Sequence, residues 1–149
     1  MKGIICLKNL ILDVEKILSR DFEKKEILNI LQQYNRNDCK EYIQFEEDGY
    51  KRNFVKKWDL FDVIVICWNQ WSRTPVHGHP SEWCYVKILE WNIKETLYSK
   101  DNQVMKNKNH YKWDLLYSHD SIWFHTLENT SVEDVISLHI YAPGNYLPN

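Results

Sequence analysis

The stretch from Val76 to Cys84 contains two histidines, His77 and His79, and a cysteine, Cys84, whose side chains are common metal ligands. The two histidines are separated by one residue, and side chains two positions apart on a β-strand point to the same face. This spacing permits both imidazoles to bind one metal ion inside a β-structure. Two exposed histidines on a half-solvated strand would show the same spacing, so a metal site requires a further ligand.

The other four histidines differ in their surroundings. His125 lies in the apolar run SIWFHTLEN, where an uncompensated imidazole would be costly to bury, and it is the preferred third ligand. His139, in SLHIY, is the competing candidate. His110 and His119 stand beside Asn, Lys, Asp and Ser residues, which predicts solvated side chains in loops.

The N-terminal segment is predicted to be helical, over about residues 7–35. Apolar residues recur at helical spacing in a first segment and again in a second one, which Asp21 could cap. The apolar positions are Leu7, Leu10, Ile11, Val14, Ile17 and Leu18, then Ile27, Leu28, Leu31 and Tyr34.

From Tyr50 onward the sequence is typical of β-strands. The runs FDVIVICW, WCYVKILEW, IKETLY, SIWFHTLEN and DVISLHIYAP are rich in β-branched and aromatic residues. The polar run from Ser99 to Asn109 predicts a surface hairpin loop without chemistry. We therefore expect a mostly β fold, an antiparallel barrel or sandwich over about residues 50–143 with a helical cap, and one domain over residues 1–149.

Composition excludes several classes of function. With 44% hydrophobic residues, a net charge of −2 and scattered lysines, the chain should fold by itself and should not bind nucleic acid. No apolar run is long enough for a membrane span, and Lys8 interrupts the only run that resembles a signal peptide. The four cysteines form no C-x-x-C pair, which favours reduced thiols and a cytoplasmic location. A monomer is expected.

The order of these motifs resembles a known family. H-x-H, followed by H-x-x-x-N from His125 to Asn129, resembles the two cupin motifs, with Cys84 where most cupins have a glutamate ligand. The segments YKRNFV, ICW, HGHPSEWCYVKILE, KETLY, HTLEN and SLHIYAP are similar, in the same order, to those of eukaryotic cysteine dioxygenases. The resemblance runs from about Tyr34 to Pro143 and implies a cupin jelly-roll.

The resemblance also implies an activity and a cofactor. In that family, the positions of His77, His79 and His125 hold one Fe(II) per chain, and L-cysteine is oxidised by O₂ to cysteine sulfinic acid. Three neutral imidazoles leave the full 2+ charge on the metal, so a thiolate substrate would supply the anion that a carboxylate ligand provides in other iron sites.

Arg52 and Tyr50 are the substrate-binding candidates that the resemblance implies. A guanidinium offers parallel donors that match a carboxylate better than a lysine ammonium does. Tyr50 lies two residues away, on the same strand face, and could add a hydroxyl. Without the resemblance, Arg52 would more simply be solvated or paired with a nearby acidic residue, and Tyr50 would be a packing residue.

Ser137, His139 and Tyr141 alternate along one predicted strand and therefore share a face. The resemblance implies a hydrogen-bonded chain that positions the Tyr141 hydroxyl near the substrate, and a possible thioether between Cys84 and Tyr141. On sequence alone, the three residues would be an inner-face stripe of a sheet, and Cys84 would be a buried, inert thiol.

The sequence also departs from the family pattern. Gly78 stands where the family commonly has Asp, and Trp83, Trp91 and Trp123 replace smaller or polar residues, which predicts a smaller pocket. The family continues for several tens of residues beyond Pro143, so the wall that closes the pocket is expected to differ. Dioxygenation of 3-mercaptopropionate and a non-catalytic metal-binding cupin remain alternatives; the missing Glu disfavours a Zn or Ni isomerase-type cupin.

Overall fold

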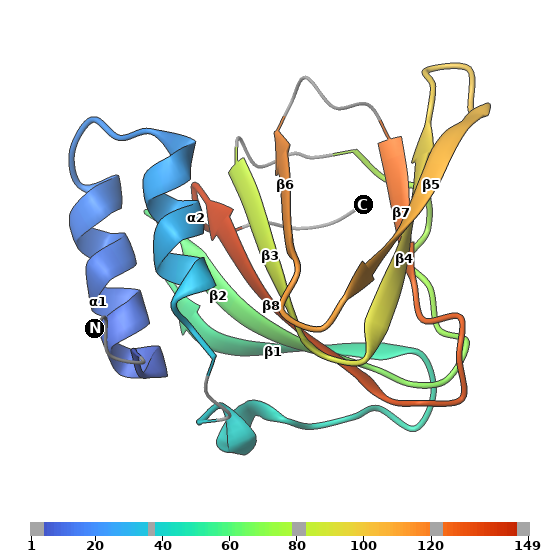
Figure 1. The fold of residues 1–149 in the computed structure, drawn as a ribbon, viewed down its shortest axis with the longest axis horizontal. Helices are drawn as coiled ribbons and strands as arrows, with labels where there is room; N and C mark the ends of the chain where they lie inside the picture. The colour runs from blue at the N-terminus through green and yellow to red at the C-terminus, as the bar shows by residue number, and fades with distance from the viewer. Residues whose placement is uncertain (1–4, 36–37, 79–82, 120–123, 146–149) are drawn as a thin grey trace.

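The computed structural model describes residues 5–35, 38–78, 83–119 and 124–145, and it places helices against one side of a β-structure (Figure 1). The helical elements are α1 (Leu7–Leu18), α2 (Lys24–Gln32) and the 3₁₀ turn η1 (Lys40–Tyr42). The strands are β1 (Tyr50–Lys57), β2 (Asp62–Trp68), β3 (Trp83–Glu90), β4 (Asn92–Tyr98), β5 (Val104–Tyr111), β6 (Leu115–His119), β7 (Phe124–Glu128) and β8 (Val135–Ala142).

The strands form two antiparallel sheets that face each other. The larger sheet has the order β1-β2-β8-β3-β6 and the smaller has the order β5-β4-β7. The described strands do not pair across from one sheet to the other, so the structure is a sandwich and not a closed barrel. The predicted mostly β jelly-roll fold with two N-terminal helices is confirmed.

The two helices agree with the predicted apolar periodicity, but α2 begins differently. Its N-cap is Glu23 and not Asp21, and Glu23 and Glu26 form a capping box in which each side chain accepts from the other residue's backbone N–H. Within the residues described, neither helix has the length and apolar character needed to cross a membrane.

Both faces of the larger sheet are buried, which explains the uninterrupted apolar run in β2. One set of alternating side chains packs under the helices, and the other set points into the sandwich. Val63, Val65, Cys67, Leu138 and Ile140 belong to the helical side, whereas Ile64, Ile66, Trp68, Cys84, Val86 and Tyr141 belong to the interior. Residues that face the smaller sheet can therefore be read from the register of each strand.

The predicted loop from Ser99 to Asn109 is wrong over much of its length, because β5 occupies residues 104–111. Seven of the eight β5 residues are exposed, and the strand pairs only with β4, at the edge of its sheet. A strand at an exposed edge needs no apolar face and gains from lysines that discourage pairing with other chains. Its polar composition therefore indicated a loop.

A buried lysine joins the helical layer to the larger sheet. The Nζ atom of Lys87 on β3 donates to the carbonyl oxygens of Leu31 and Gln32, at 2.7 and 3.2 Å, and to Asn35 Oδ1 at 3.1 Å. The Leu31 and Gln32 carbonyls are the last two of α2, where a positive charge is favourable. Burial lowers the pKa of Lys87 to about 8. The lysine thus fixes the position of α2 on the sheet.

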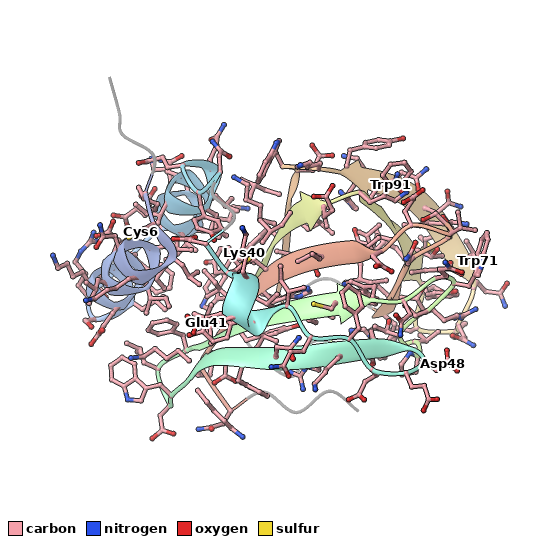
Figure 2. The ribbon with its side chains drawn as sticks, turned by 90° about the horizontal axis from the view of Figure 1, so that it is seen from below. Cys6, Lys40, Glu41, Asp48, Trp71 and Trp91 are labelled. Atoms are coloured by element: carbon pink, nitrogen blue, oxygen red, sulfur yellow. The ribbon has the colours of Figure 1, made fainter. Side chains whose placement is uncertain are left out.

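Trp83 and Trp91, two of the tryptophans expected to narrow the pocket, lie outside the interior between the two sheets. Figure 2 shows Trp91 and Trp71 at the end of the molecule farthest from α1, and Trp91 is 44% exposed. Its φ of 62° is in the left-handed region that favours glycine. Trp83 stacks on Tyr117 and contacts Phe22 on the helical side of the sheet. The predicted narrowing is therefore wrong for Trp83 and Trp91, and Trp123 lies outside the described residues.

Asn129 anchors the turns that flank the small sheet, and we expect its loss to destabilise the fold. It is fully buried, its Nδ2 donates to the carbonyl oxygens of Asn69 and Glu133, and its Oδ1 accepts from the backbone and side chain of Ser131. Asn129→Ala should lower the free energy of unfolding by about 2–4 kcal/mol in urea titrations. Asn109→Ala, at an exposed position of β5, is the matched control and should change it little.

Two buried tyrosines should respond oppositely to the same substitution. The Tyr85 hydroxyl is buried without a hydrogen-bond partner among the described residues, whereas the Tyr34 hydroxyl donates to Asp38 Oδ1 at 2.6 Å. Tyr85→Phe should raise the free energy of unfolding by about 1 kcal/mol, and Tyr34→Phe should lower it by about 1–2 kcal/mol. Urea unfolding measures both; a clear loss of stability in Tyr85→Phe would contradict this reading of its hydroxyl.

Candidate metal centre and its surroundings

Two histidines from different segments face each other at the inner side of the small sheet. The backbones of His77 and His125 form an isolated antiparallel bridge, with N–H···O distances of 3.0 Å in both directions. Their Nε2 atoms are 3.0 Å apart, and His125 is only 4% exposed. The structure therefore brings together two of the three predicted ligands. His79, the third, lies outside the described residues.

The other nitrogen of each ring is held by an acceptor. His77 Nδ1 lies 2.8 Å from the Pro75 carbonyl oxygen, and His125 Nδ1 lies 2.8 Å from Glu95 Oε2. Because a carbonyl or carboxylate oxygen only accepts, both Nδ1 atoms carry the proton, and the neutral rings have their lone pairs on Nε2. Burial lowers the pKa of His77, which favours its neutral form.

The donor set fits a metal ion. Two facing lone pairs need a proton or a cation between them, and metal-binding histidines usually donate their other N–H to a carbonyl or carboxylate. Two nitrogens at ~2.1 Å from one cation and at right angles around it would lie about 3.0 Å apart, which agrees with the 3.0 Å between the Nε2 atoms of His77 and His125. In the part of the chain that is described, no group of three metal-binding side chains is complete.

Glu95 on β4 is a site residue that the sequence analysis missed. Burial alone would raise its pKa, but hydrogen bonds from His110 and His125 outweigh burial and lower the pKa to about 2. Glu95 is thus an ionised carboxylate at neutral pH. Its segment, KETLY, looked like an ordinary strand, and only the pairing of β4 with β7 places the carboxylate beside His125.

His110 also differs from its prediction. It was expected to be solvated in a loop, but it lies in β5, is 7% exposed, and places Nε2 3.1 Å from Glu95 Oε1. The prediction was wrong because the neighbours of His110 in β5 are exposed and polar, while this one side chain points inward.

Ser137, His139 and Tyr141 share the inner face of β8, as predicted. Ser137 Oγ lies 2.7 Å from His139 Nε2, and the Tyr141 hydroxyl lies 3.1 Å from His139 Nδ1. Both ring nitrogens of His139 are therefore engaged within β8, which separates it from the facing pair His77 and His125. Burial, and then the positive charge of Arg52, lower the pKa of His139 to about 3, so the ring is neutral.

The indole of Trp68 sets the direction of the hydrogen bonds along Ser137, His139 and Tyr141. The sequence did not indicate Trp68 as a site residue. Its indole Nε1 donates to Ser137 Oγ at 2.9 Å. An indole N–H can only donate, so Ser137 accepts from it and directs its own proton to His139 Nε2. A neutral His139 then carries its proton on Nδ1 and donates to the Tyr141 oxygen. The Tyr141 proton is left to point to a third group.

Of the remaining predicted site residues, Arg52 and Cys84 lie close to Tyr141, whereas Tyr50 lies beside Trp68. Arg52 on β1 is half-buried, with its guanidinium carbon 6.0 Å from the centre of the Tyr141 ring. Tyr50 packs its ring on Trp68, with centroids 5.0 Å apart. Cys84 on β3 pairs directly with Tyr141 across the sheet, and burial raises the pKa of its thiol to about 12. The cysteine is therefore a neutral thiol beside the phenol.

Gly78, between the two N-terminal histidines, lies under an aromatic ring. A Cβ atom at this position would be 3.3 Å from Phe124 Cε1, which is tighter than ordinary van der Waals contact. Phe124 precedes His125, so the ring of β7 covers the backbone next to His77. The absence of a side chain at residue 78 thus allows this close approach, and it accounts locally for Gly where the family commonly has Asp.

The sandwich and its facing histidines define the class of protein to which the chain belongs. Its fold matches a conserved protein with a double-stranded β-helix domain from Klebsiella pneumoniae, with a TM-score of 0.63, 16% identity and coverage of 74% of this chain and 91% of that one. It also matches the cupin domain of Schizosaccharomyces pombe Cnp3, with a TM-score of 0.56, 15% identity and coverage of 68% and 64%. The fold is that of the cupins.

Among proteins with the cupin fold, the chain can be assigned to one particular family. The model of the family "Cysteine dioxygenase type I" matches residues 5–146, and the chain belongs to this family. Cysteine dioxygenase type 1 of Rattus norvegicus is 31% identical over 129 residues, which cover 80% of this chain and 64% of the relative. The Danio rerio protein is 28% identical over 149 residues, covering 92% and 74%. The chain thus spans about two thirds of the length of the rat protein.

The family membership confirms the resemblance that the sequence motifs indicated. The peptide bond between Ala142 and Pro143, at the end of the matched motifs, is cis.

Proposed function

We propose that this chain is an iron-dependent thiol dioxygenase that converts L-cysteine and O₂ to cysteine sulfinic acid. The observation that carries the proposal is the facing pair of Nε2 atoms on His77 and His125, each prepared for a metal by an acceptor on Nδ1. His79 would be the third ligand of one Fe(II) per chain. When bound, ferrous iron supplies electrons and open coordination positions for the reaction of O₂ with a thiolate.

Arg52 would select the substrate by its carboxylate. Its guanidinium lies on the inner face of β1, close to Tyr141 and facing the same interior as the histidines. A bidentate pair with a carboxylate fixes both position and orientation, which brings the thiol end of a small amino acid toward the histidines. Both L-cysteine and 3-mercaptopropionate have a carboxylate, and cysteamine lacks one.

Tyr141 would provide a hydrogen bond at the reacting end of the substrate. The row from Trp68 through Ser137 and His139 occupies the phenol oxygen as an acceptor, so its proton is directed elsewhere. Because His139 is neutral and buried, the row holds the phenol in place and does not add a charge to the site. Tyr50, packed on Trp68, would support this arrangement from β1.

The decisive experiment is anaerobic loading with Fe(II), followed by oxygen uptake and product analysis with L-cysteine, 3-mercaptopropionate and cysteamine. Uptake of one O₂ per cysteine, with both oxygen atoms in the sulfinic acid, is the expected result. If oxygen were taken up with 3-mercaptopropionate but not with L-cysteine, the substrate would be 3-mercaptopropionate. No uptake with any thiol by an iron-loaded chain would favour a metal-binding cupin without catalysis.

Cys84 and Tyr141 should become joined by a thioether during aerobic turnover. They are direct partners across β3 and β8, and the thiol and the phenol are within hydrogen-bonding contact. The link removes one hydrogen from the thiol and one from the ring, with O₂ as the oxidant. Peptide mass spectrometry after turnover should show the two segments joined and lighter by two hydrogens. Tyr141→Phe is the control; separate, unmodified peptides from the wild type would rule out the link.

A further inference from the structure

A cleft between the two sheets reaches the back of the candidate metal centre. It has a volume of about 240 Å³ and is lined by residues of β4, β5 and β6, among them Glu95, His110, Lys106 and Lys108. Glu95 also accepts the hydrogen bond from His125. This carboxylate therefore connects the cleft with the ring whose Nε2 faces His77.

Three side chains from three neighbouring strands form the connection. His110 on β5 contacts Glu95 Oε1 at 3.1 Å, and His125 on β7 contacts Glu95 Oε2 at 2.8 Å. Each carboxylate oxygen thus has one imidazole partner. The side chains of His110, Glu95 and His125 are 9%, 13% and 5% exposed, so these hydrogen bonds are largely shielded from water.

Without His110, Glu95 would have other partners. Lys106 and Lys108 line the same cleft, and a carboxylate released on one side could turn toward an ammonium group or toward water. A turn of the carboxylate would remove the acceptor from His125 Nδ1. The His125 ring would then lose the interaction that fixes its orientation and places its lone pair on Nε2.

We infer that His110 is a positioning residue for the metal centre: it holds Glu95 in the orientation that fixes the His125 ring. The inference rests on the proposed metal site but not on thiol oxidation. His110 touches neither the metal nor the substrate. Because His110 acts through Glu95, substitution of His110 should no longer affect metal binding once the Glu95 carboxylate has been removed.

The test is the affinity for Co(II), measured by titrating the metal-free chain and following the optical bands of the bound ion. His110→Leu should weaken Co(II) binding by about tenfold, within the range seen for partners of metal ligands. His110→Gln, whose Nε2 can reach the same oxygen, should restore most of the affinity. In a Glu95→Ala background, which removes the acceptor for His125 Nδ1, His110→Leu should cause no further loss.

The outcomes distinguish positioning from a general structural role. An unchanged affinity in His110→Leu, or the same tenfold loss with Glu95→Ala present, would overturn the inference. If His110→Leu fails to fold by circular dichroism, His110→Phe keeps the ring volume and takes its place under the same criteria. A wild-type chain that binds Co(II) and, loaded with Fe(II), oxidises no thiol would contradict the proposed function while the affinities still decide the role of His110.

Discussion

His125→Ala should leave the chain unable to retain iron and should abolish thiol-dependent oxygen uptake. His125 supplies one of the two facing Nε2 atoms, and it is also the link between Glu95 and the centre. Loss of a ligand should weaken Fe(II) binding by more than the ~10–100-fold that loss of a ligand's hydrogen-bond partner costs. Iron content after anaerobic loading and gel filtration measures the effect directly.

His119, which is not among the predicted ligands, gives the matched control for this experiment. His119 lies at the end of β6 and belongs neither to H-x-H nor to the H-x-x-x-N motif. His119→Ala should retain iron like the wild type. An His125→Ala chain that keeps a full equivalent of iron would remove His125 from the ligand set.

Arg52→Ala should raise the KM for cysteine by roughly 100-fold while iron content stays near that of the wild type. A bidentate, charge-assisted contact with a carboxylate is worth about 3 kcal/mol, and 1.4 kcal/mol corresponds to a factor of ten. The carboxylate of the substrate would lose its partner, whereas the histidines would keep theirs. Steady-state oxygen uptake against cysteine concentration, with iron quantified in each sample, separates the two effects.

Two further variants define the role of Arg52. Lys51→Ala is the control, because Lys51 is the adjacent residue of β1 and its Nζ bonds to Gln44 at the surface. Arg52→Lys keeps the charge and loses the planar fork, so it should recover only part of the KM. A large loss of iron in Arg52→Ala, with little change in KM, would mean that the substrate role assigned to this residue is wrong.

The strongly patterned parts of the fold were predictable from the sequence. Residues 7–18, with their helical periodicity, form α1, and the β-branched run of residues 62–68 forms β2, an interior strand of the larger sheet. Strand β5 was not, because VMKNKNHY has no apolar face. Its pairing energy comes from backbone hydrogen bonds with β4, and those depend on a partner that local composition does not reveal.

The candidate site, like the fold, was predictable from the sequence in some parts and not in others. The alternation of Ser137, His139 and Tyr141 predicted a shared face, and the structure shows a hydrogen-bonded row there. Glu95 and Trp68 were missed because each acts on a residue far away in the sequence: Glu95 on His125, and Trp68 on Ser137. Such contacts arise from sheet register, which spacing within one segment does not encode.

X-ray absorption spectroscopy of the chain loaded anaerobically with Fe(II) tests the metal centre most directly. One iron per chain, with multiple-scattering features of about three imidazole rings at ~2.1 Å, is the expected result. A chain that retains no iron, or a first shell of oxygen atoms without imidazole scattering, would contradict an iron centre built from His77, His79 and His125.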